Sequence, residues 1–238
     1  MRDDPDDLAA IRDSVRALCT DFPGEYWREK DRNRAYPSEF VTALGEAGYL
    51  AALIPEEFGG AGLPISAAAA ILEEIQRQGC NGGAVHAQMY IMGTVLRHGS
   101  DAQKAEYLPK IATGELRMQA FGVTQPSSGT DTLSLKTTAE KNGDKYIVNG
   151  QKIWTSRAEH SDLMLLLART APKDETASRT GGLSVFLVDM KAALGAGTLI
   201  IRPIDTMMNH ATTEVFFDNM QIPAANLIGE EGKGFRYI

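Results

Sequence analysis

The 238-residue chain is poor in cysteine and in long apolar runs, and each shortage argues against a class of protein. Cys19 and Cys80, its two cysteines, have neither CxxC nor metal-type spacing. We expect both to be small core residues, in separate helices, in a reducing compartment. No segment approaches the roughly 18 apolar residues of a membrane-spanning helix. The acidic start MRDDPDDLAA lacks the apolar region of a secretory signal, so a cytoplasmic protein is expected.

Basic charge and paired histidines are also scarce. The formal net charge is -7, and no basic stripe is present, so nucleic acid is not an expected partner. The histidines lack the spacing of metal ligands, so no metal site is expected. These scattered residues are His86, His98, His160 and His210. What remains is an ordinary globular composition, 43% hydrophobic and 23% charged, in a chain long enough for one large or two small domains.

The first half of the sequence has helical periodicity. Apolar residues recur at three- and four-residue steps, as on one face of a helix. Ser66 and Asp101 are expected to be N-caps, while Gly48 and Gly114 mark helix ends. The predicted helices cover Leu8–Leu18, a segment from Pro37 to Gly48, Ser66–Gln78, Ala84–Leu96 and Asp101–Gly114.

The pattern changes to strands after Gly114. Residues Lys136–Thr155 read as consecutive antiparallel strands, with Asn142-Gly143 and Asn149-Gly150 as tight turns that need positive φ. The polar segment Thr170–Gly182 is expected to be an exposed loop. Further short apolar strands are predicted at Leu163–Leu167, Leu183–Val188, Leu199–Ile201 and Glu214–Phe217.

These two patterns predict an α+β protein. An all-α domain over residues 1–116 precedes a β-barrel or β-sandwich domain over residues 117–230, and no internal repeat is present. The Gly-rich stretch Glu56–Gly62 does not have GxGxxG spacing, and no strand leads into it. It therefore indicates a connection between helices, not a dinucleotide-binding turn.

The stretch FGVTQPSSGTD (121–131) and the later IWTS (153–156) are the richest in chemistry. Small hydroxyl residues and a glycine accompany a tryptophan, which suits a flat aromatic cofactor with polar edges. Trp154 alone is ambiguous, because a tryptophan on a strand is more often core than cofactor wall. The interpretation depends on the neighbouring segments.

Five segments occur in a fixed order: IPEEFGGAGLP, LPKIATGE, FGVTQPSSGTD, YIVNGQKIWTS and EVFFDNMQIPAANLIGEEGKGF. Together they resemble the acyl-CoA dehydrogenase family across essentially the whole chain. The resemblance implies an N-terminal helical domain, a middle β domain and a C-terminal four-helix bundle. Of that bundle, residues 231–238 match only the beginning.

The resemblance also implies FAD. The segment from Phe121 to Thr130 would line the flavin through backbone groups and hydroxyls, and the segment from Trp154 to Ser156 would cover its ring and contact N5. A hydrogen-bond donor at N5 stabilises the more electron-rich reduced ring. Thr130 would also lie near the substrate. The cofactor residues that it implies are Phe121, Val123, Thr124, Gly129, Thr130, Trp154, Thr155 and Ser156.

Three positions depart from the commoner family pattern. Gln125 stands where Glu is usual, Thr130 where Ser is usual, and Ser156 where Thr is usual. The last two keep a hydroxyl, and Gln125 keeps an amide that can donate and accept. None of the three departures therefore excludes flavin binding, and they bear on the flavin potential and the substrate fit.

The family reaction needs a carboxylate that removes the α-proton of an acyl-CoA thioester while hydride goes to flavin N5. No residue of this chain matches that base, which we expect beyond Ile238, and assigning Glu214 or Glu230 would rest on residue type alone. The resemblance further implies an electron-transferring flavoprotein as partner and a homo-oligomer. Without the bundle, an apolar face of the β domain is expected to be exposed.

Two alternatives stay open. The chain on its own is either the amino-terminal part of a working dehydrogenase or a catalytically silent fragment that binds flavin or a partner subunit. Within the enzyme reading, an acyl-CoA oxidase or a flavin monooxygenase of similar fold is the competitor, because oxygen access depends on the closed pocket.

Overall fold

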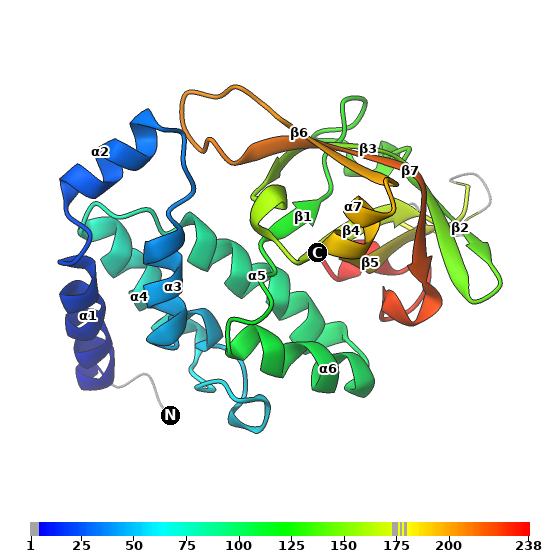
Figure 1. Cartoon of the computed structure of the whole chain (residues 1–238). Helices are drawn as coiled ribbons and strands as arrows, with labels where there is room; N and C mark the ends of the chain where they lie inside the picture. Colours follow the sequence, from blue (N-terminus) through cyan, green and yellow to red (C-terminus); the bar gives the residue numbers. More distant parts are fainter. Residues whose placement is uncertain (1–4, 173–175, 177, 179) are drawn as a thin grey trace. The chain divides into compact units, whose positions relative to one another are not determined.

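A computed structural model describes residues 5–172, 176, 178 and 180–238 (Figure 1). The chain divides into two compact units. The helical unit comprises Met1–Leu96 and Lys104–Arg117, and the β unit comprises Arg97–Gln103 and Met118–Ile238. The chain therefore enters the β unit twice. Domain limits at residues 116, 117 and 230 stay a prediction.

Six α-helices and two short 3-10 helices are described up to residue 112, and the sequence pattern finds most of them. A buried core of aliphatic, aromatic and small side chains fills the helical unit, including Phe40, Leu44, Ile71 and Val85. The helices are α1 Pro5–Cys19, α2 Gly24–Arg32, α3 Ser38–Glu46, η1 Tyr49–Ala51, η2 Glu56–Phe58, α4 Ile65–Arg77, α5 Gly83–His98 and α6 Asp101–Ala112 (Figure 1).

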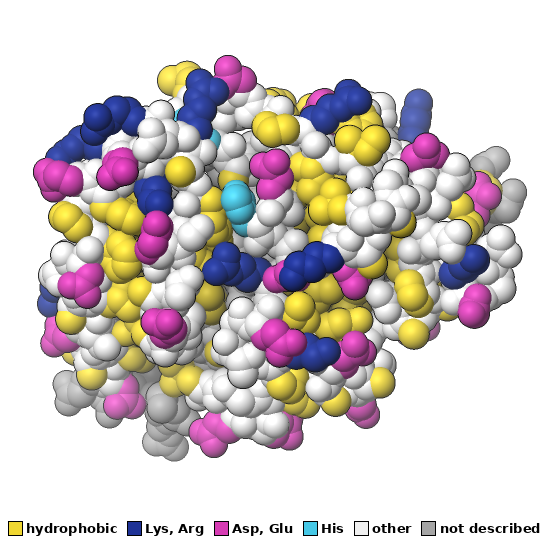
Figure 2. Space-filling view, viewed as in Figure 1, with side chains coloured by type: hydrophobic (Ala, Val, Ile, Leu, Met, Phe, Trp, Pro, Cys, Tyr) yellow, Lys and Arg dark blue, Asp and Glu magenta, His cyan; other side chains and the backbone are white. Residues whose placement is uncertain are grey.

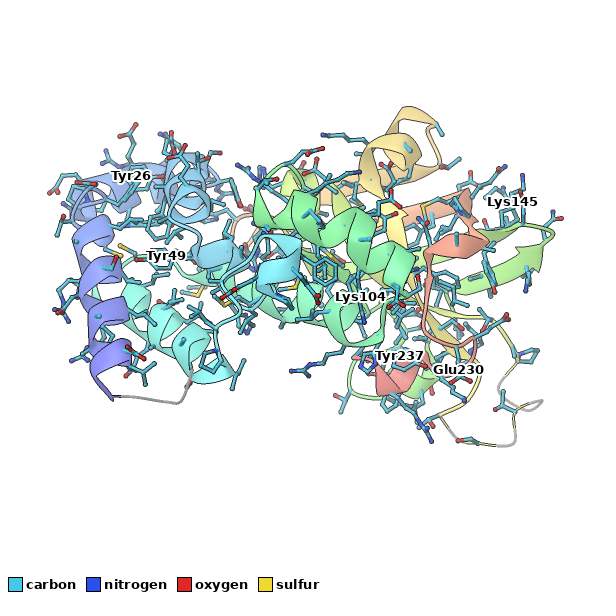
Figure 3. The ribbon with its side chains drawn as sticks, turned by 90° about the horizontal axis from the view of Figure 1, so that it is seen from below. Tyr26, Tyr49, Lys104, Lys145, Glu230 and Tyr237 are labelled. Carbon is cyan, nitrogen blue, oxygen red and sulfur yellow. The ribbon has the colours of Figure 1, made fainter. Side chains whose placement is uncertain are left out.

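Helices α1 and α4 pack together and are joined by charge. The buried Glu74 of α4 accepts a hydrogen bond from Arg16 Nε of α1 at 2.9 Å and from Gln78 Nε2 at 2.7 Å. Burial acts to raise the pKa of Glu74, but the hydrogen bonds from Gln78 and Arg16 outweigh it, so the pKa lies below its ordinary value. Tyr49 donates a hydrogen bond to Ser14 of α1 at 2.8 Å, and Figure 3 labels this tyrosine in the helical unit.

Four details of the predicted helices are wrong. The sequence pattern missed α2, whose charged sequence GEYWREKDR has no buried residue. Ser66 is not the N-cap of α4, because the helix begins at Ile65 and Pro64 occupies the N-cap position without a side-chain capping bond. Cys80 is buried as predicted, but it lies after α4 rather than in a helix.

The fourth detail is the start of α6, which Ser100 caps in place of Asp101. Ser100 Oγ accepts a hydrogen bond from the Gln103 backbone N at 3.2 Å, and Gln103 Oε1 accepts one from the Ser100 backbone N at 2.9 Å. This reciprocal pair is a capping box. Gln103 Nε2 also donates to the carbonyls of Ala225 and Leu227, at 2.7 and 2.9 Å. The first turn of α6 is thereby fixed to the end of the β unit.

The described residues of the β unit form a single sheet in the order β6-β7-β3-β2-β4-β5-β8, with β1 pairing parallel to β4. Helix α7, Met190–Gly195, packs against β5 and β6. The strands are β1 Ala120–Gly122, β2 Thr138–Asn142, β3 Lys145–Ser156, β4 Leu163–Arg169, β5 Leu183–Asp189, β6 Leu199–Pro203, β7 Thr212–Pro223 and β8 Leu227–Ile228. The predicted helical-then-β fold class is confirmed.

The tight turn predicted at Asn149-Gly150 is wrong, because both residues lie inside the long strand β3. The β3–β7 pairing shifts register between Val148 and Gly150, which marks a bulge. Gly150 has φ +145, and a Cβ there would lie 2.7 Å from Thr137 Oγ1. Glycine is therefore needed where β3 passes close to Thr137, the residue before β2, and not for a hairpin.

Buried side chains from most strands form the core of the β unit, among them Tyr146, Phe186 and Val215. Beyond β8, the last residues fold back on the unit. Tyr237 accepts a hydrogen bond from the Glu230 backbone N at 3.1 Å, and Figure 3 labels both residues. Parts of the predicted loop Thr170–Gly182, namely residues 173–175, 177 and 179, lie outside the described residues.

The described residues form no cluster of three His, Cys, Asp or Glu side chains suited to a metal ion. No described helix combines the length and the apolar character needed to cross a membrane. On the face in view in Figure 2, Lys and Arg side chains are interspersed with Asp and Glu.

Candidate functional site

The structure brings the two segments together inside the β unit. Phe121 lies on β1, opposite Leu165 of β4, and the chain leaves the sheet at Val123. The Ile153 backbone N of β3 donates a hydrogen bond to the Thr124 carbonyl at 2.9 Å. The end of β3 therefore lies against the segment that follows β1, as a shared binding wall would require.

A buried lysine makes the second connection between these segments. Lys152 has an exposed fraction of 0%, and its Nζ donates to the Val123 carbonyl at 2.8 Å. None of the ion pairs among the described residues includes it. Burial lowers the pKa of Lys152 to about 7, because the ammonium loses its water without gaining a carboxylate. Lys152 holds the carbonyl through a hydrogen bond that requires only an N–H donor.

Side chains alternate at the end of β3. Trp154 is 57% exposed, Thr155 is buried and Ser156 is half-buried. The core interpretation of Trp154 therefore does not hold. The Thr155 side chain faces inward, where its hydroxyl has no partner among the described residues, and its carbonyl accepts from Thr213 Oγ1 at 2.8 Å. Trp154 and Ser156 are the members of this segment that reach solvent.

The backbone at this point adopts unusual conformations. Trp154, Arg157 and Asn209 have φ values of +62, +60 and +57. Such left-handed conformations cost bulky residues about 1 kcal/mol or more each and cluster at functional sites. The Arg157 backbone N donates to the Ala211 carbonyl at 2.6 Å, which ties the end of β3 to the β6–β7 connection. The surrounding contacts hold the strained backbone in place.

The residues after Thr124 form a rigid turn. Gln125 is buried, and its Oε1 accepts hydrogen bonds from the backbone N and Oγ1 of Thr137, at 3.1 and 3.0 Å. Its Nε2 donates to Ser127 Oγ at 2.9 Å, and its backbone exchanges two hydrogen bonds with Ser128. The amide at Gln125 therefore shapes the turn from inside, in a role that uses both its donor and its acceptor.

Gly129 and Thr130 lie beyond this turn and are exposed. No hydrogen bond among the described residues joins either of them to Trp154–Ser156. The hydroxyls of Thr124 and Thr130 also have no partner within the described part of the chain. Together with the exposed Trp154 ring, these free donors fit a flat ligand with a polar edge, such as the flavin implied by the resemblance.

Two residues of the site were missed by the sequence interpretation. Lys152 gave no signal, because a lysine on a strand is ordinarily exposed. Asn209 contacts Ser156 across 53 positions in the chain, Asn209 Nδ2 to Ser156 Oγ at 2.9 Å. The two glutamates weighed as bases have structural contacts: Glu214 accepts a hydrogen bond from Gln151 Nε2 at 3.3 Å, and Glu230 pairs with Lys233. Glu231, next to Glu230, accepts a hydrogen bond from the Tyr146 hydroxyl at 2.8 Å. Tyr146 has its pKa raised to about 12 by burial and by Glu231.

The exposed large apolar side chains of the described β unit come from several elements, and whether they form one continuous face stays a prediction. They are Trp154, Leu194, Ile200, Met207, Met208 and Ile238. Met207 and Met208 belong to the β6–β7 connection that carries Asn209, and their exposed fractions are 98% and 76%. Apolar groups so exposed are available to a ligand or partner.

Comparison with known proteins gives a consistent result. The family profile described as "Acyl-CoA dehydrogenase, N-terminal domain" matches residues 5–115, and that described as "Acyl-CoA dehydrogenase, middle domain" matches residues 120–220. A cyclohex-1-ene-1-carbonyl-CoA dehydrogenase of Syntrophus aciditrophicus (strain SB) is 36% identical over 215 residues, covering 88% of this chain and 50% of that protein. A glutaryl-CoA dehydrogenase of Desulfococcus multivorans is 34% identical over 236 residues, covering 96% and 57%.

A solved acyl-CoA dehydrogenase from Geobacillus kaustophilus superposes with a TM-score of 0.88 at 29% identity, covering 99% of this chain and 61% of that one. The chain thus spans about half the length of the curated relatives that it matches. Both matched regions, in the predicted order, account for most of the described residues. The chain belongs to the acyl-CoA dehydrogenase family, of which it carries the N-terminal and middle domains.

Proposed function

We propose that this chain supplies the flavin-binding wall of an FAD-dependent dehydrogenase that introduces an α,β double bond into an acyl-CoA thioester. The observation that carries the proposal is the exposed Trp154, held at positive φ beside the Thr124 segment. A large apolar side chain placed in solvent by a strained backbone has no role in folding that would offset the strain.

When bound, FAD would supply the hydride acceptor. In this proposal Trp154 covers the ring and excludes water, and Thr124, Thr130 and Ser156 donate hydrogen bonds to its polar edge. Phe121, Val123 and Gly129 would contact the flavin from the segment of residues 121–130. Thr155 would contribute through its backbone, because its side chain is buried. Each of these roles follows the residue positions implied by the family resemblance.

Lys152 and Gln125 would hold the wall in shape. Lys152 fixes the Val123 carbonyl, and Gln125 fixes the turn before Gly129. A site that is formed before the ligand arrives loses less entropy on binding. We propose that both residues act on the ligand only through the backbone that they hold.

No residue of this chain is assigned the α-proton base. We propose that the base comes from outside residues 1–238, that residues 1–116 and 117–230 are separate domains, and that residues 231–238 begin a further helical domain. The isolated chain would then bind FAD without oxidising acyl-CoA. By family membership, an electron-transferring flavoprotein would accept the electrons.

Titration of the purified chain with FAD, followed by flavin fluorescence and by colour after gel filtration, tests the proposal. We expect flavin bound at close to one per chain. Anaerobic addition of acyl-CoA thioesters of several lengths should leave the flavin absorbance unchanged. A chain that retains no flavin would contradict the binding role, and rapid bleaching by an acyl-CoA would contradict the absence of a base.

A further inference from the structure

Among the described residues, the hydroxyl of Ser156 has one hydrogen-bond partner, the Asn209 side chain. Asn209 Nδ2 donates to Ser156 Oγ at 2.9 Å. Rotating the Asn209 amide by half a turn would break a second hydrogen bond, because Arg157 Nη1 donates to Asn209 Oδ1 at 3.4 Å. An amide oxygen accepts and an amide nitrogen donates, so the guanidinium determines which end of Asn209 faces Ser156.

The backbone of Asn209 is also held. Its carbonyl accepts hydrogen bonds from the backbone N and Oγ1 of Thr212, at 3.1 and 2.7 Å. Its φ of +57 lies in the left-handed region, which asparagine tolerates better than most residues. A residue held by its own carbonyl and by a neighbouring arginine presents its side chain in one direction.

This geometry determines what the Ser156 hydroxyl can do. A hydroxyl has one proton to donate and two lone pairs that accept. Asn209 uses an accepting position, so the proton of Ser156 stays available. No acceptor among the described residues takes that proton. Ser156 is half-buried beside the exposed Trp154, so its proton is available to a ligand that packs on the tryptophan.

We propose that Asn209 is a positioning residue that makes Ser156 a hydrogen-bond donor toward the bound flavin. The inference rests on the proposed function, since it needs FAD to pack on Trp154. Asn209 does not touch the ligand in this account. It acts by occupying the accepting side of the hydroxyl, which would otherwise rotate freely or donate its proton to water.

The substitution N209D reverses the polarity of the contact. The introduced carboxylate would keep the attraction to Arg157, so the side chain should stay in place. Both carboxylate oxygens accept, and Ser156 would then donate its proton to position 209 instead of to the flavin. We expect N209D to bind FAD roughly tenfold more weakly, the size of one hydrogen bond of this kind. The absorbance spectrum of the residual bound flavin should also shift.

N219D is the matched control. Asn219 lies on β7, has φ +48, and is also hydrogen-bonded through its side chain, to Asp218 and to Asn149. N219D should therefore change stability without changing FAD affinity or the flavin spectrum. Equal FAD binding and equal spectra for N209D and the unchanged chain would overturn the inference and leave the proposed function standing.

A measurement without flavin tests the contact itself. S156A, N209G and the double variant are compared by thermal unfolding of the full chain, because glycine at 209 tolerates the positive φ. The two changes should be non-additive, since each removes the same hydrogen bond. Additive effects would overturn the inference. If the unchanged chain binds no FAD although the changes are non-additive, the proposed function fails and the inference falls with it.

Discussion

The two units contain one tryptophan each and place it in opposite surroundings. Trp27 of the helical unit donates its indole N–H to the Phe22 carbonyl at 3.0 Å and packs edge-to-face with Tyr26 and Phe40, with ring centroids 5.0 Å apart in each pair. Trp154 of the β unit is 57% exposed on a strained backbone. The half-buried ring of Trp27 packs against a core, whereas the ring of Trp154 extends into solvent.

The two units also differ in their buried charge. Glu74 and Lys152 both have an exposed fraction of 0%. Glu74 accepts hydrogen bonds from an arginine and an amide, whereas the one acceptor that Lys152 has among the described residues is the Val123 carbonyl, and its pKa is lowered. The paired carboxylate of Glu74, between two packed helices, contributes to the stability of the fold. Lys152 has no carboxylate partner among the described residues and lies beneath the candidate site, where its hydrogen bond holds the backbone at a cost in desolvation.

The largest expected effect separates the two tryptophans. W27A should lower the free energy of unfolding by about 3 kcal/mol, because it empties part of an aromatic cluster. W154A should change it by less than about 1 kcal/mol, because little packing is lost at an exposed position. Chemical denaturation of both variants measures the difference. Equal losses would show that Trp154 is a core residue after all.

A second prediction concerns Lys152 and pH. Its folded pKa of about 7 lies below the ordinary value of about 10.4 for an unfolded lysine. Between these values the unfolded chain holds a proton that the folded chain has released, so stability rises with pH. The gain is fully present above the unfolded pKa and is lost as pH falls to the folded one.

K152M removes that proton linkage. Between pH 7 and pH 9 the unchanged chain should gain about 2 kcal/mol of stability relative to K152M, because the folded lysine is still half protonated at pH 7. Lys141, exposed on β2, provides the control, and K141M should follow the pH profile of the unchanged chain. Urea unfolding at the two pH values gives the comparison. Parallel profiles for K152M and the unchanged chain would mean that Lys152 stays protonated when buried.

A third, smaller effect tests the paired charge. R16Q removes a donor from the buried Glu74, and the melting temperature should fall by about 5 °C. R28Q breaks the exposed pair of Arg28 with Glu25 and should change it by about 1 °C. Differential scanning calorimetry separates the two. A negligible effect of R16Q would place the Glu74 pair among ordinary surface pairs.

The smallest expected change in free energy concerns FAD binding, and it is the prediction most specific to the proposed function. W154F should weaken FAD binding about fivefold, since phenylalanine keeps part of the ring contact. The variant W27F, which retains Trp154, tests the contact directly, because bound FAD should quench most of its tryptophan emission. Emission that FAD leaves unchanged in W27F would show that Trp154 does not contact the flavin.

Periodicity predicted the elements whose apolar face decides their structure. Helix α5 and strands β4 and β5 have long buried runs, and the sequence pattern located them to within two residues. The sequence pattern missed helix α2 because this helix buries none of its side chains completely, so it has no continuous apolar face. The prediction of a turn at Asn149-Gly150 was wrong because a bulge and a turn both favour glycine. Only the close approach of Thr137, just before β2, distinguishes the two.

The site was predictable in its segments and not in its contacts. The hydroxyls and the tryptophan of 121–131 and 153–156 are visible as residue types, and the structure joins the segments at Thr124 and Ile153. The burial of Lys152 and the contact of Asn209 with Ser156 depend on side-chain directions set by the whole sheet. A single sequence contains no information about pairs so far apart.

The capping box at Ser100 and Gln103 has a consequence for protein engineering. Gln103 donates to the carbonyls of Ala225 and Leu227, and the seven residues Arg97–Gln103, from the end of α5 to the first turn of α6, belong to the β unit. A truncation that begins at Met118 would leave two carbonyls without their donor and should expose the end of the sheet to exchange and aggregation. An independent β fragment would need residues 97–103 restored, for example by a short fused peptide or by circular permutation.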